Sequence, residues 1–214
     1  MPHVIETTVY TFPELPDDAK DAARNWFRES VGDFDWYEFI YDDFEAVCSI
    51  LGIELKIRTV RLWGGGSRGR PCIWFSGFSS QGDGACFEGR YRYAAGAAKS
   101  LRAHAPEDAV LHDIADRLQA IQRRNFFQLY ADIAHRGRYY HSGCMSVSVE
   151  RDSPVYQAMT SDAEDELTAC LRALADWLYR QLEREWDWMM SDAYADEGLI
   201  ANGYTFTETG RRFG

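Results

Sequence analysis

Residues 75–89, FSGFSSQGDGACFEG, concentrate side chains that could carry chemistry. The stretch contains two carboxylates: Asp83 lies between Gly82 and Gly84, and Glu88 precedes Gly89. His141 follows in a later segment. Two carboxylates and an imidazole around one cavity can perform general acid–base catalysis, for example on a phosphate ester or a nucleotide. A small enzyme with a site around residues 79–88 and His141 is therefore the alternative hypothesis for this chain.

Complete motifs for nucleophilic or phosphate chemistry are missing from the same stretch. Residues 77–81, GFSSQ, lack the second glycine of the GxSxG nucleophile elbow. No lysine follows the glycines, as a phosphate-binding P-loop requires. Side chains of the types that bind zinc are Asp83, Cys86, Glu88, His141 and Cys144. In a strand, however, residues three apart such as His141 and Cys144 point to opposite faces, so we expect no metal and no cofactor.

A structural interpretation competes with both of these. Residues 81–84, QGDG, are typical of a turn, because glycine adopts positive φ and an aspartate can bond to nearby backbone. We expect residues 79–86 to form an ordered loop at the end of a strand pair, in which Gly82 and Gly84 are needed for positive φ. A polar contact site for a partner is the other interpretation, with these candidate residues: Ser79, Ser80, Gln81, Asp83, Glu88 and His141.

Apolar periodicity around this loop predicts an α+β fold, with an antiparallel or mixed sheet and long amphipathic helices packed on it. The expected strands cover residues 1–12, 53–62, 71–78, 87–94, 138–150 and 203–212, and the expected helices cover residues 17–29, 35–51, 107–135 and 161–190. Several strands are joined by loops too short for parallel crossovers. Because no linker, repeat or low-complexity tract interrupts the pattern, we expect residues 1–214 to form a single α+β domain.

The chain is acidic, with 34 acidic and 23 basic residues and a net charge of −11. The charge is uneven, since residues 1–50 carry −9, residues 51–150 carry +5 and residues 151–214 carry −7. Carboxylates recur along the helix expected over residues 35–51, opposite its apolar face. They form a candidate partner-binding stripe: Asp35, Glu38, Asp42, Asp43 and Glu45. One helix is too sparse to mimic DNA, so mimicry would require the acidic N-terminal region to converge with the carboxylates at residues 162–166.

Arginines concentrate in the basic middle of the chain. Four surround Trp63 and its glycines, and four mark the end of the helix expected over residues 107–135: Arg58, Arg61, Arg68, Arg70, Arg123, Arg124, Arg136 and Arg138. Arginine beside aromatic residues suits nucleic acid or phosphate. A net charge of −11 opposes unaided binding to a polyanion. We therefore expect these arginines to pair with the acidic ends of the chain, and we do not expect nucleic acid as a direct partner.

Several segments carry a family resemblance, above all FSGFSSQGDGACFEGRYRY, GRYYHSGCMSVSVE and YTFTETGRR. Together with VYTFPELPDDAKDAARNWFRE and DWYEFIYDDFEAV, they resemble a family of small phage- and prophage-encoded proteins along the whole chain. Members of that family are often labelled antitoxins of a toxin–antitoxin stability system. The resemblance implies a phage context and an inhibitory or protective role, and it transfers no catalytic residues.

The first hypothesis is therefore a non-enzymatic, phage-encoded acidic protein that neutralises a host or toxin protein. We expect an antitoxin-like or anti-defence inhibitor whose partner has a basic surface, for example one that normally holds nucleic acid. Five cysteines without a CxxC pair predict a reducing compartment, and no apolar run reaches the length of a membrane helix. The N-terminus lacks the pattern of a signal peptide. We expect the cytoplasm of the host bacterium and no membrane partner.

Overall fold

A four-stranded antiparallel sheet lies at the centre of the larger of two compact units. The computed structural model describes residues 3, 6–31 and 34–214. Contacts divide the chain into a smaller unit, Met1–Glu38 with Glu183–Gly214, and a larger unit, Phe39–Leu182. This division into contact units does not test whether residues 1–214 form a single domain, which stays a prediction.

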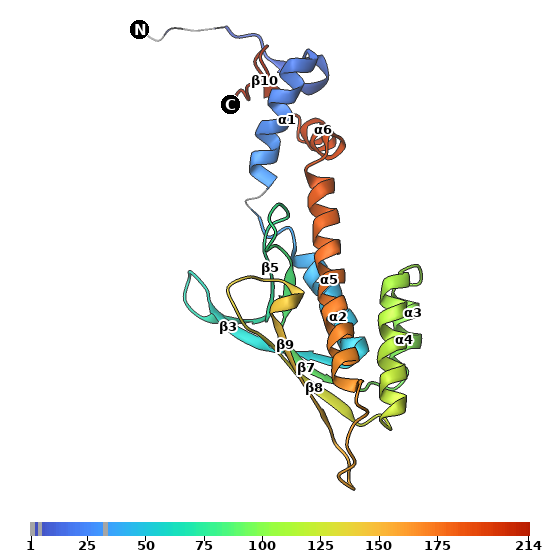
Figure 1. The fold of residues 1–214 in the computed structure, drawn as a ribbon. Coiled ribbons are helices and arrows are strands. Elements are labelled where there is room, and N and C mark those ends of the chain that lie inside the picture. Colours follow the sequence, from blue (N-terminus) through green and yellow to red (C-terminus); the bar gives the residue numbers. More distant parts are fainter. Residues whose placement is uncertain (1–2, 4–5, 32–33) are drawn as a thin grey trace. The chain divides into compact units, whose positions relative to one another are not determined.

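Short strands and four helices build the larger unit (Figure 1). Its strands are β2 (Ile53–Leu55), β3 (Ile57–Arg61), β4 (Ser67–Pro71), β5 (Ile73–Phe75), β6 (Ala85–Phe87), β7 (Gly89–Arg92), β8 (Leu129–His135) and β9 (Met145–Arg151). Its helices are α2 (Glu38–Leu51), α3 (Ala97–His104), α4 (Ala109–Arg124) and the first part of α5 (Ala163–Met189). The central sheet has the order β2-β7-β8-β9, and β3–β4 and β5–β6 form two separate hairpins.

One face of the central sheet is covered and the other is polar. Leu129, Ala131 and Ile133 of β8 are buried on the face that the helices cover, seen in Figure 1 as helices lying to one side of the strands. On the opposite face Arg90 donates from Nε to Asp132 Oδ1 at 2.8 Å. This division is typical of an antiparallel sheet with one solvated face. The predicted α+β class, with antiparallel sheets and packed helices, is confirmed.

The helix expected over residues 107–135 is instead two elements, α4 and then β8. Phe126 and Phe127 adopt φ values of 58° and 60°, a left-handed conformation that an α-helix does not contain. The prediction was wrong because Leu129 and Ile133 fit two periods. Their spacing of four continues a helical stripe, but it is also twice the period of a strand.

The side chain of Gln122 holds the end of α4 against the start of β8. It is fully buried, and its Oε1 accepts the Leu129 N–H at 3.1 Å while its Nε2 donates to the Leu129 C=O at 2.8 Å. Nε2 also lies 3.4 Å from the Tyr91 hydroxyl, and the backbone C=O of Gln122 accepts the Phe127 N–H at 2.7 Å. These four bonds, the Gln122 clasp, fix the direction in which the chain enters the sheet.

The strand expected over residues 53–62 also divides, at Lys56, into β2 and β3. Lys56 donates its N–H to the Glu88 C=O at 2.9 Å and accepts the Cys72 N–H on its own C=O at 2.7 Å. The chain therefore changes its partner strand at this residue and leaves the central sheet. The short helix α3 was not expected from the sequence.

The smaller unit combines segments from both ends of the chain. It contains η1 (Phe12–Glu14), α1 (Asp17–Val31), the last part of α5, α6 (Asp192–Ala201) and a two-stranded sheet of β1 (Tyr10–Thr11) with β10 (Thr205–Phe206). Its core consists of Phe12, Leu15, Ala19, Ala23, Leu199 and Phe206. Arg24 joins α1 to α6 through bonds of 2.6 and 2.8 Å to the Asp196 carboxylate. No helix in the described ranges has the length and apolar character that crossing a bilayer requires.

We expect the substitution Gln122→Leu to lower the free energy of unfolding by about 1–3 kcal/mol. Leucine fills a similar volume but leaves the buried N–H and C=O of Leu129 without hydrogen-bond partners. Urea unfolding followed by circular dichroism measures the change. Arg123→Leu, at the exposed neighbouring position, is the control and should change stability by less than about 0.5 kcal/mol. Equal stability of the two variants would contradict the role of the clasp.

Candidate functional site

Residues 76–84 form a closed loop that joins β5 to β6. The Asp83 carboxylate accepts the N–H groups of Ser79 and Ser80 at 2.9 and 2.7 Å, and these bonds, with that of Ser80 the larger, lower its pKa. The Ser76 N–H donates to the Gly84 C=O at 3.0 Å, which closes the base of the loop. A loop at the end of a strand pair is confirmed, but it covers residues 76–84 instead of the expected 79–86, because Ala85 and Cys86 belong to β6.

The two glycines of this loop are required for a different reason from the one expected. Neither has positive φ. A Cβ at Gly84 would lie 2.5 Å from the Cβ of His141 and 2.8 Å from its Cα. A Cβ at Gly82 would lie 3.0 Å from the ring of Tyr139. The glycines therefore allow residues 139–141 to pack closely on the loop.

His141 and Cys144 lie together, contrary to the expectation for residues three apart. The strand expected over residues 138–150 begins only at Met145, and residues 142–144 form the 3₁₀ helix η2 (Ser142–Cys144). A single turn of 3₁₀ helix places positions three apart on the same side. Cys144 Sγ consequently lies 3.3 Å from His141 Nε2, within hydrogen-bond distance for sulfur.

Glu88 is engaged by groups other than His141. Its Oε2 accepts from Lys56 Nζ at 2.6 Å, and its Oε1 accepts the His135 N–H at 3.1 Å. Burial raises the pKa of Glu88, but these two hydrogen bonds and the charge of Lys56 outweigh burial and lower it. Trp74 stacks on Tyr140, with ring centroids 6.0 Å apart and planes 9° apart.

The residues predicted for the loop site thus separate into different roles. Asp83 bonds to the loop backbone, Glu88 bonds to Lys56 and His135, and His141 bonds to Cys144. At the loop tip, Ser79, Ser80 and Gln81 are exposed. Within the described ranges, no three His, Cys, Asp or Glu side chains are grouped so that they could hold one metal ion. Both the enzymatic alternative and the contact-site alternative stay predictions.

The predicted acidic stripe is divided between the two units. Asp35 and Glu38 belong to the smaller unit, where Asp35 accepts a hydrogen bond from the Tyr37 hydroxyl at 3.0 Å. In the larger unit, Asp43 lies 2.8 Å from His104 Nε2. Burial and the nearby charge of Asp42 raise the pKa of Glu45, opposed by Arg68. Asp42 and Asp43 are the exposed members on α2.

The net charge of the chain is divided very unevenly between the two units. The smaller unit has 16 acidic and 6 basic residues, a net charge of −10. The larger unit has 18 acidic and 17 basic residues, a net charge of −1. The acidic N-terminal region shares its unit with the acidic segment after residue 183. The carboxylates at residues 162–166 do not belong to that unit, and two of them, Asp162 and Glu166, bond to Arg124.

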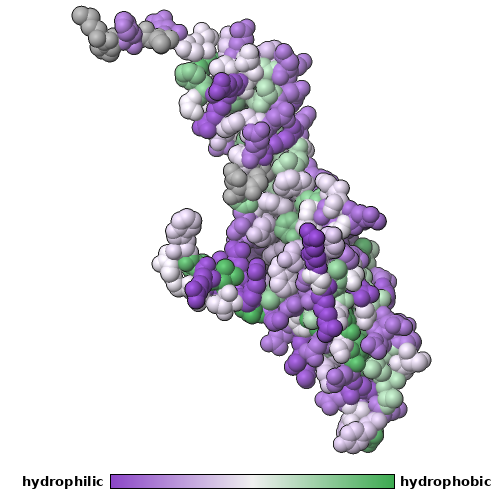
Figure 2. All heavy atoms as spheres, turned by 60° about the vertical axis from the view of Figure 1, so that its left-hand side comes forward, coloured by the Kyte–Doolittle hydropathy of each residue, from purple (hydrophilic) through white to green (hydrophobic). Residues whose placement is uncertain are grey.

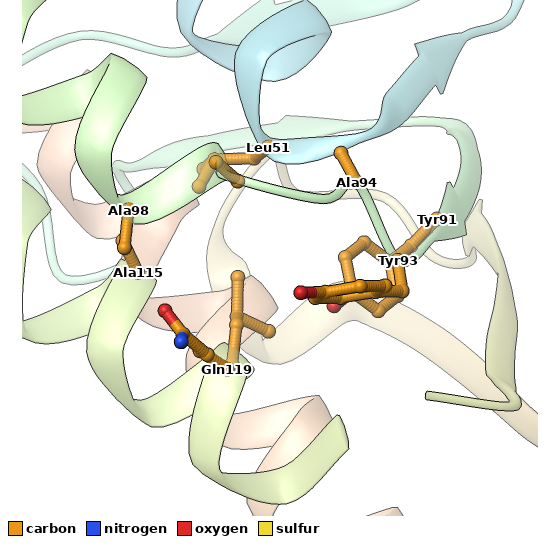
Figure 3. A pocket seen from close by; sticks show the side chains of 9 residues that line it. Leu51, Tyr91, Tyr93, Ala94, Ala98, Ala115 and Gln119 are labelled. Atoms are coloured by element: carbon orange, nitrogen blue, oxygen red, sulfur yellow. The ribbon is translucent and has the colours of Figure 1, made fainter. Parts of the chain in front are cut away.

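A small cavity inside the larger unit is too small for a substrate. Figure 3 shows its lining, with Tyr91 of β7 and Tyr93 just after that strand opposite Gln119 of α4, and with Leu51 at the end of α2. Its volume is about 10 Å³. That is room for about one water molecule, whereas ligand pockets measure about 300–1,000 Å³.

The sequence profile of a family described as a domain of unknown function, DUF8835, matches residues 36–192. This is more than half of the chain, so the chain belongs to that family. No curated protein and no solved structure matches it. The matched range contains the whole larger unit and includes only part of the acidic smaller unit.

We expect Gly84→Ala to lower the free energy of unfolding by about 1–3 kcal/mol, as is usual for overpacking. The new methyl would meet the Cα and Cβ of His141, which cannot rotate away. Gly82→Ala is the matched control and should cost less, because the ring it meets, Tyr139, is 54% exposed and can move. Thermal unfolding of both variants measures the difference. A larger loss for Gly82→Ala would show that close packing on His141 is not the reason for the glycine.

We expect Cys144 to be the first of the five cysteines to react with iodoacetamide in the folded protein. It is half-buried, whereas the others are buried, and burial raises the pKa of Cys86 to about 12 and that of Cys170 to about 11. The imidazole of His141 can accept the thiol proton of Cys144. Peptide mass spectrometry should show slower alkylation of Cys144 in the His141→Ala variant and equal alkylation of all five cysteines in urea.

Modification of a buried cysteine before Cys144 would contradict this assignment. An unchanged rate at Cys144 in the His141→Ala variant would show that the imidazole does not activate the thiol.

Proposed function

We propose that this protein is a non-enzymatic inhibitor that binds a basic surface of a protein partner through its smaller, acidic unit. The observation that carries the proposal is the net charge of −10 within Met1–Glu38 and Glu183–Gly214. A host or toxin protein is the expected partner, in the cytoplasm of a bacterium, in keeping with the resemblance to phage-encoded antitoxin-like proteins. A surface that normally holds nucleic acid would have the complementary charge.

Ion pairs inside the smaller unit leave a surplus of exposed carboxylates. Its two central arginines, Arg24 and Arg28, pair with Asp21, Asp192 and Asp196. Further carboxylates are exposed and, among the described residues, form no ion pair: Asp18, Glu29, Asp187 and Glu197. The face of this unit seen in Figure 2 is largely hydrophilic. These carboxylates can therefore interact with positive charge on another molecule.

The same unit also exposes large apolar side chains that could anchor a partner. Phe34, Trp188 and Ile200 are 52%, 47% and 56% exposed. Interface cores are enriched in aromatic residues, and charged residues at the rim contribute mainly to the rate of association and to specificity. A few apolar anchors among carboxylates therefore suit binding to a basic protein surface better than binding to a small molecule.

We expect the tagged protein to capture such a partner from a bacterial lysate at low salt and to lose most of it at about 300 mM salt. Exposed charge pairs are screened over about 8 Å at physiological ionic strength. The test variant carries Asp18→Asn, Glu29→Gln, Asp187→Asn and Glu197→Gln, and it should capture much less of the same chain. Once the partner is purified, the variant should show slower association by at least about ten-fold.

The control variant changes the same number of exposed carboxylates in the larger unit: Glu107→Gln, Asp152→Asn, Asp165→Asn and Asp176→Asn. Its net charge equals that of the test variant, so a specific site in the smaller unit predicts normal capture. Equal losses in both variants, or capture that is indifferent to salt, would refute the proposal.

A further inference from the structure

The β3–β4 hairpin projects from the rest of the larger unit as a separate two-stranded ribbon. Figure 2 shows it standing clear of the body, with strongly hydrophilic residues along it. Its register pairs Arg58 with Arg70 and Val60 with Arg68. Residues directly opposite in a ladder share a face, and so do residues two apart in one strand. Arg58 and Val60 therefore point to the same side, and Arg68, opposite Val60, points there too. Arg61, one position out of step, points to the other side.

The tip of this hairpin presents a tryptophan to solvent. The Leu62 C=O accepts the Gly65 N–H at 3.1 Å, so Trp63 and Gly64 are the central residues of a tight turn. Gly65 and Gly66 have φ values of 86° and 89°, which glycine adopts without strain. Trp63 is 106% exposed. An aromatic ring of this size is normally buried, and here it has no apolar surface of its own chain to cover it.

The hairpin is also free of negative charge. Residues 55–82 contain four arginines and one lysine and no aspartate or glutamate. The expected pairing of these arginines with the acidic ends of the chain is not found for Arg58, Arg61 and Arg68, which form no ion pair in the described part of the chain. The Arg58 guanidinium instead lies 5.7 Å from the centre of the Trp74 ring.

The net charge of the chain does not exclude a polyanion at this hairpin. The value of −11 is the sum over all 214 residues. Ten of those charges belong to the smaller unit, and the larger unit, which carries the hairpin, is close to neutral at −1. Because that value includes the charge of +5 over residues 55–82, the remaining residues of the larger unit carry −6.

We propose that the β3–β4 hairpin binds single-stranded nucleic acid, with phosphates on Arg58 and Arg68 on one side of the ribbon and on Arg61 on the other, and with a base stacked on Trp63. Single-strand binding combines a positively charged path for the backbone with exposed aromatic rings on which bases stack. Arginine suits phosphate because its guanidinium offers several donors in one plane. Duplex nucleic acid hides its bases, so it would use the arginines and leave Trp63 without a partner. This inference goes beyond the proposed function and does not depend on it.

The test measures fluorescence anisotropy of a fluorescein-labelled dT20 oligonucleotide titrated with the intact protein. We expect binding at about 50 mM salt that weakens steeply with added salt. The variant Arg58→Gln/Arg61→Gln/Arg68→Gln should weaken binding at least ten-fold and reduce the slope of log K against log salt by about 2, at about 0.7 per phosphate contact. Trp63→Ala should weaken binding at least about five-fold, and Trp63→Phe should restore most of it.

Controls that remove the same number of positive charges, or one exposed aromatic ring, at other positions separate a site from a general charge effect. Lys99→Gln/Arg117→Gln/Arg123→Gln removes three positive charges from α3 and α4, and Tyr156→Ala removes a 97% exposed ring. Both should bind dT20 as the unchanged protein does. The carboxylate variant of the smaller unit should also keep its binding, so failure of the inhibitor proposal and failure of this one give different results.

Several outcomes would overturn the inference. These are no binding to dT20 at 50 mM salt, equal weakening by the arginine variant and its control, or no effect of Trp63→Ala. Tighter binding to a 20-base-pair duplex than to dT20 would refute base stacking. Binding to vesicles of phosphatidylglycerol without binding to dT20 would assign the hairpin to a membrane surface instead.

Discussion

The larger unit depends on one reversal of the chain, where α4 ends and β8 begins. Two consecutive phenylalanines take left-handed backbone conformations there, and the Gln122 clasp satisfies the first N–H and C=O of the new strand inside the core. β8 is a central strand, hydrogen-bonded to β7 on one side and β9 on the other. A shift of one residue in β8 would exchange its buried and exposed faces. The amide of one glutamine therefore sets the register of the sheet on which four helices pack.

The strands of the larger unit are short, so the chain changes its partner strand often. At Lys56 it leaves the central sheet for a hairpin, and near Cys72 and Glu88 it returns, through backbone bonds shared among these three residues. The two hairpins that result have opposite characters. The β5–β6 loop is folded back on residues 139–141 by its glycines and by Asp83. The β3–β4 hairpin extends into solvent with its arginines and its tryptophan exposed. The loop with the greater number of candidate catalytic side chains, β5–β6, is thus packed against its own chain, whereas the β3–β4 hairpin is the more accessible of the two.

Sequence patterns predicted the α+β class and several elements well, because α2 and most of α5 have long apolar stripes that fit only a helical period. They failed where a short apolar series fits two periods, as at Leu129 and Ile133. They also failed where one residue changes its partner strand, because Lys56 looks like any exposed strand residue. The proximity of His141 and Cys144 could not be predicted, since it requires a 3₁₀ turn in a segment that alternates like a strand. The division of charge between units follows from which distant segments pack together, and periodicity contains no such information. Residues 55–82 do contain a signal for a local basic surface, because they lack acidic residues in an otherwise acidic chain.

The pairing of β1 with β10 has a consequence for the order in which the molecule can form. Tyr10 pairs with Phe206, and both ends of the chain lie in the smaller unit (Figure 1). The larger unit is thus an insertion between two halves of the smaller one. During synthesis, all residues of the larger unit are made and emerge from the ribosome before those of β10, so that unit can fold first. The acidic unit closes only after residue 206 has been made. A chain that is cut short during translation would therefore present the basic hairpin without the completed acidic unit.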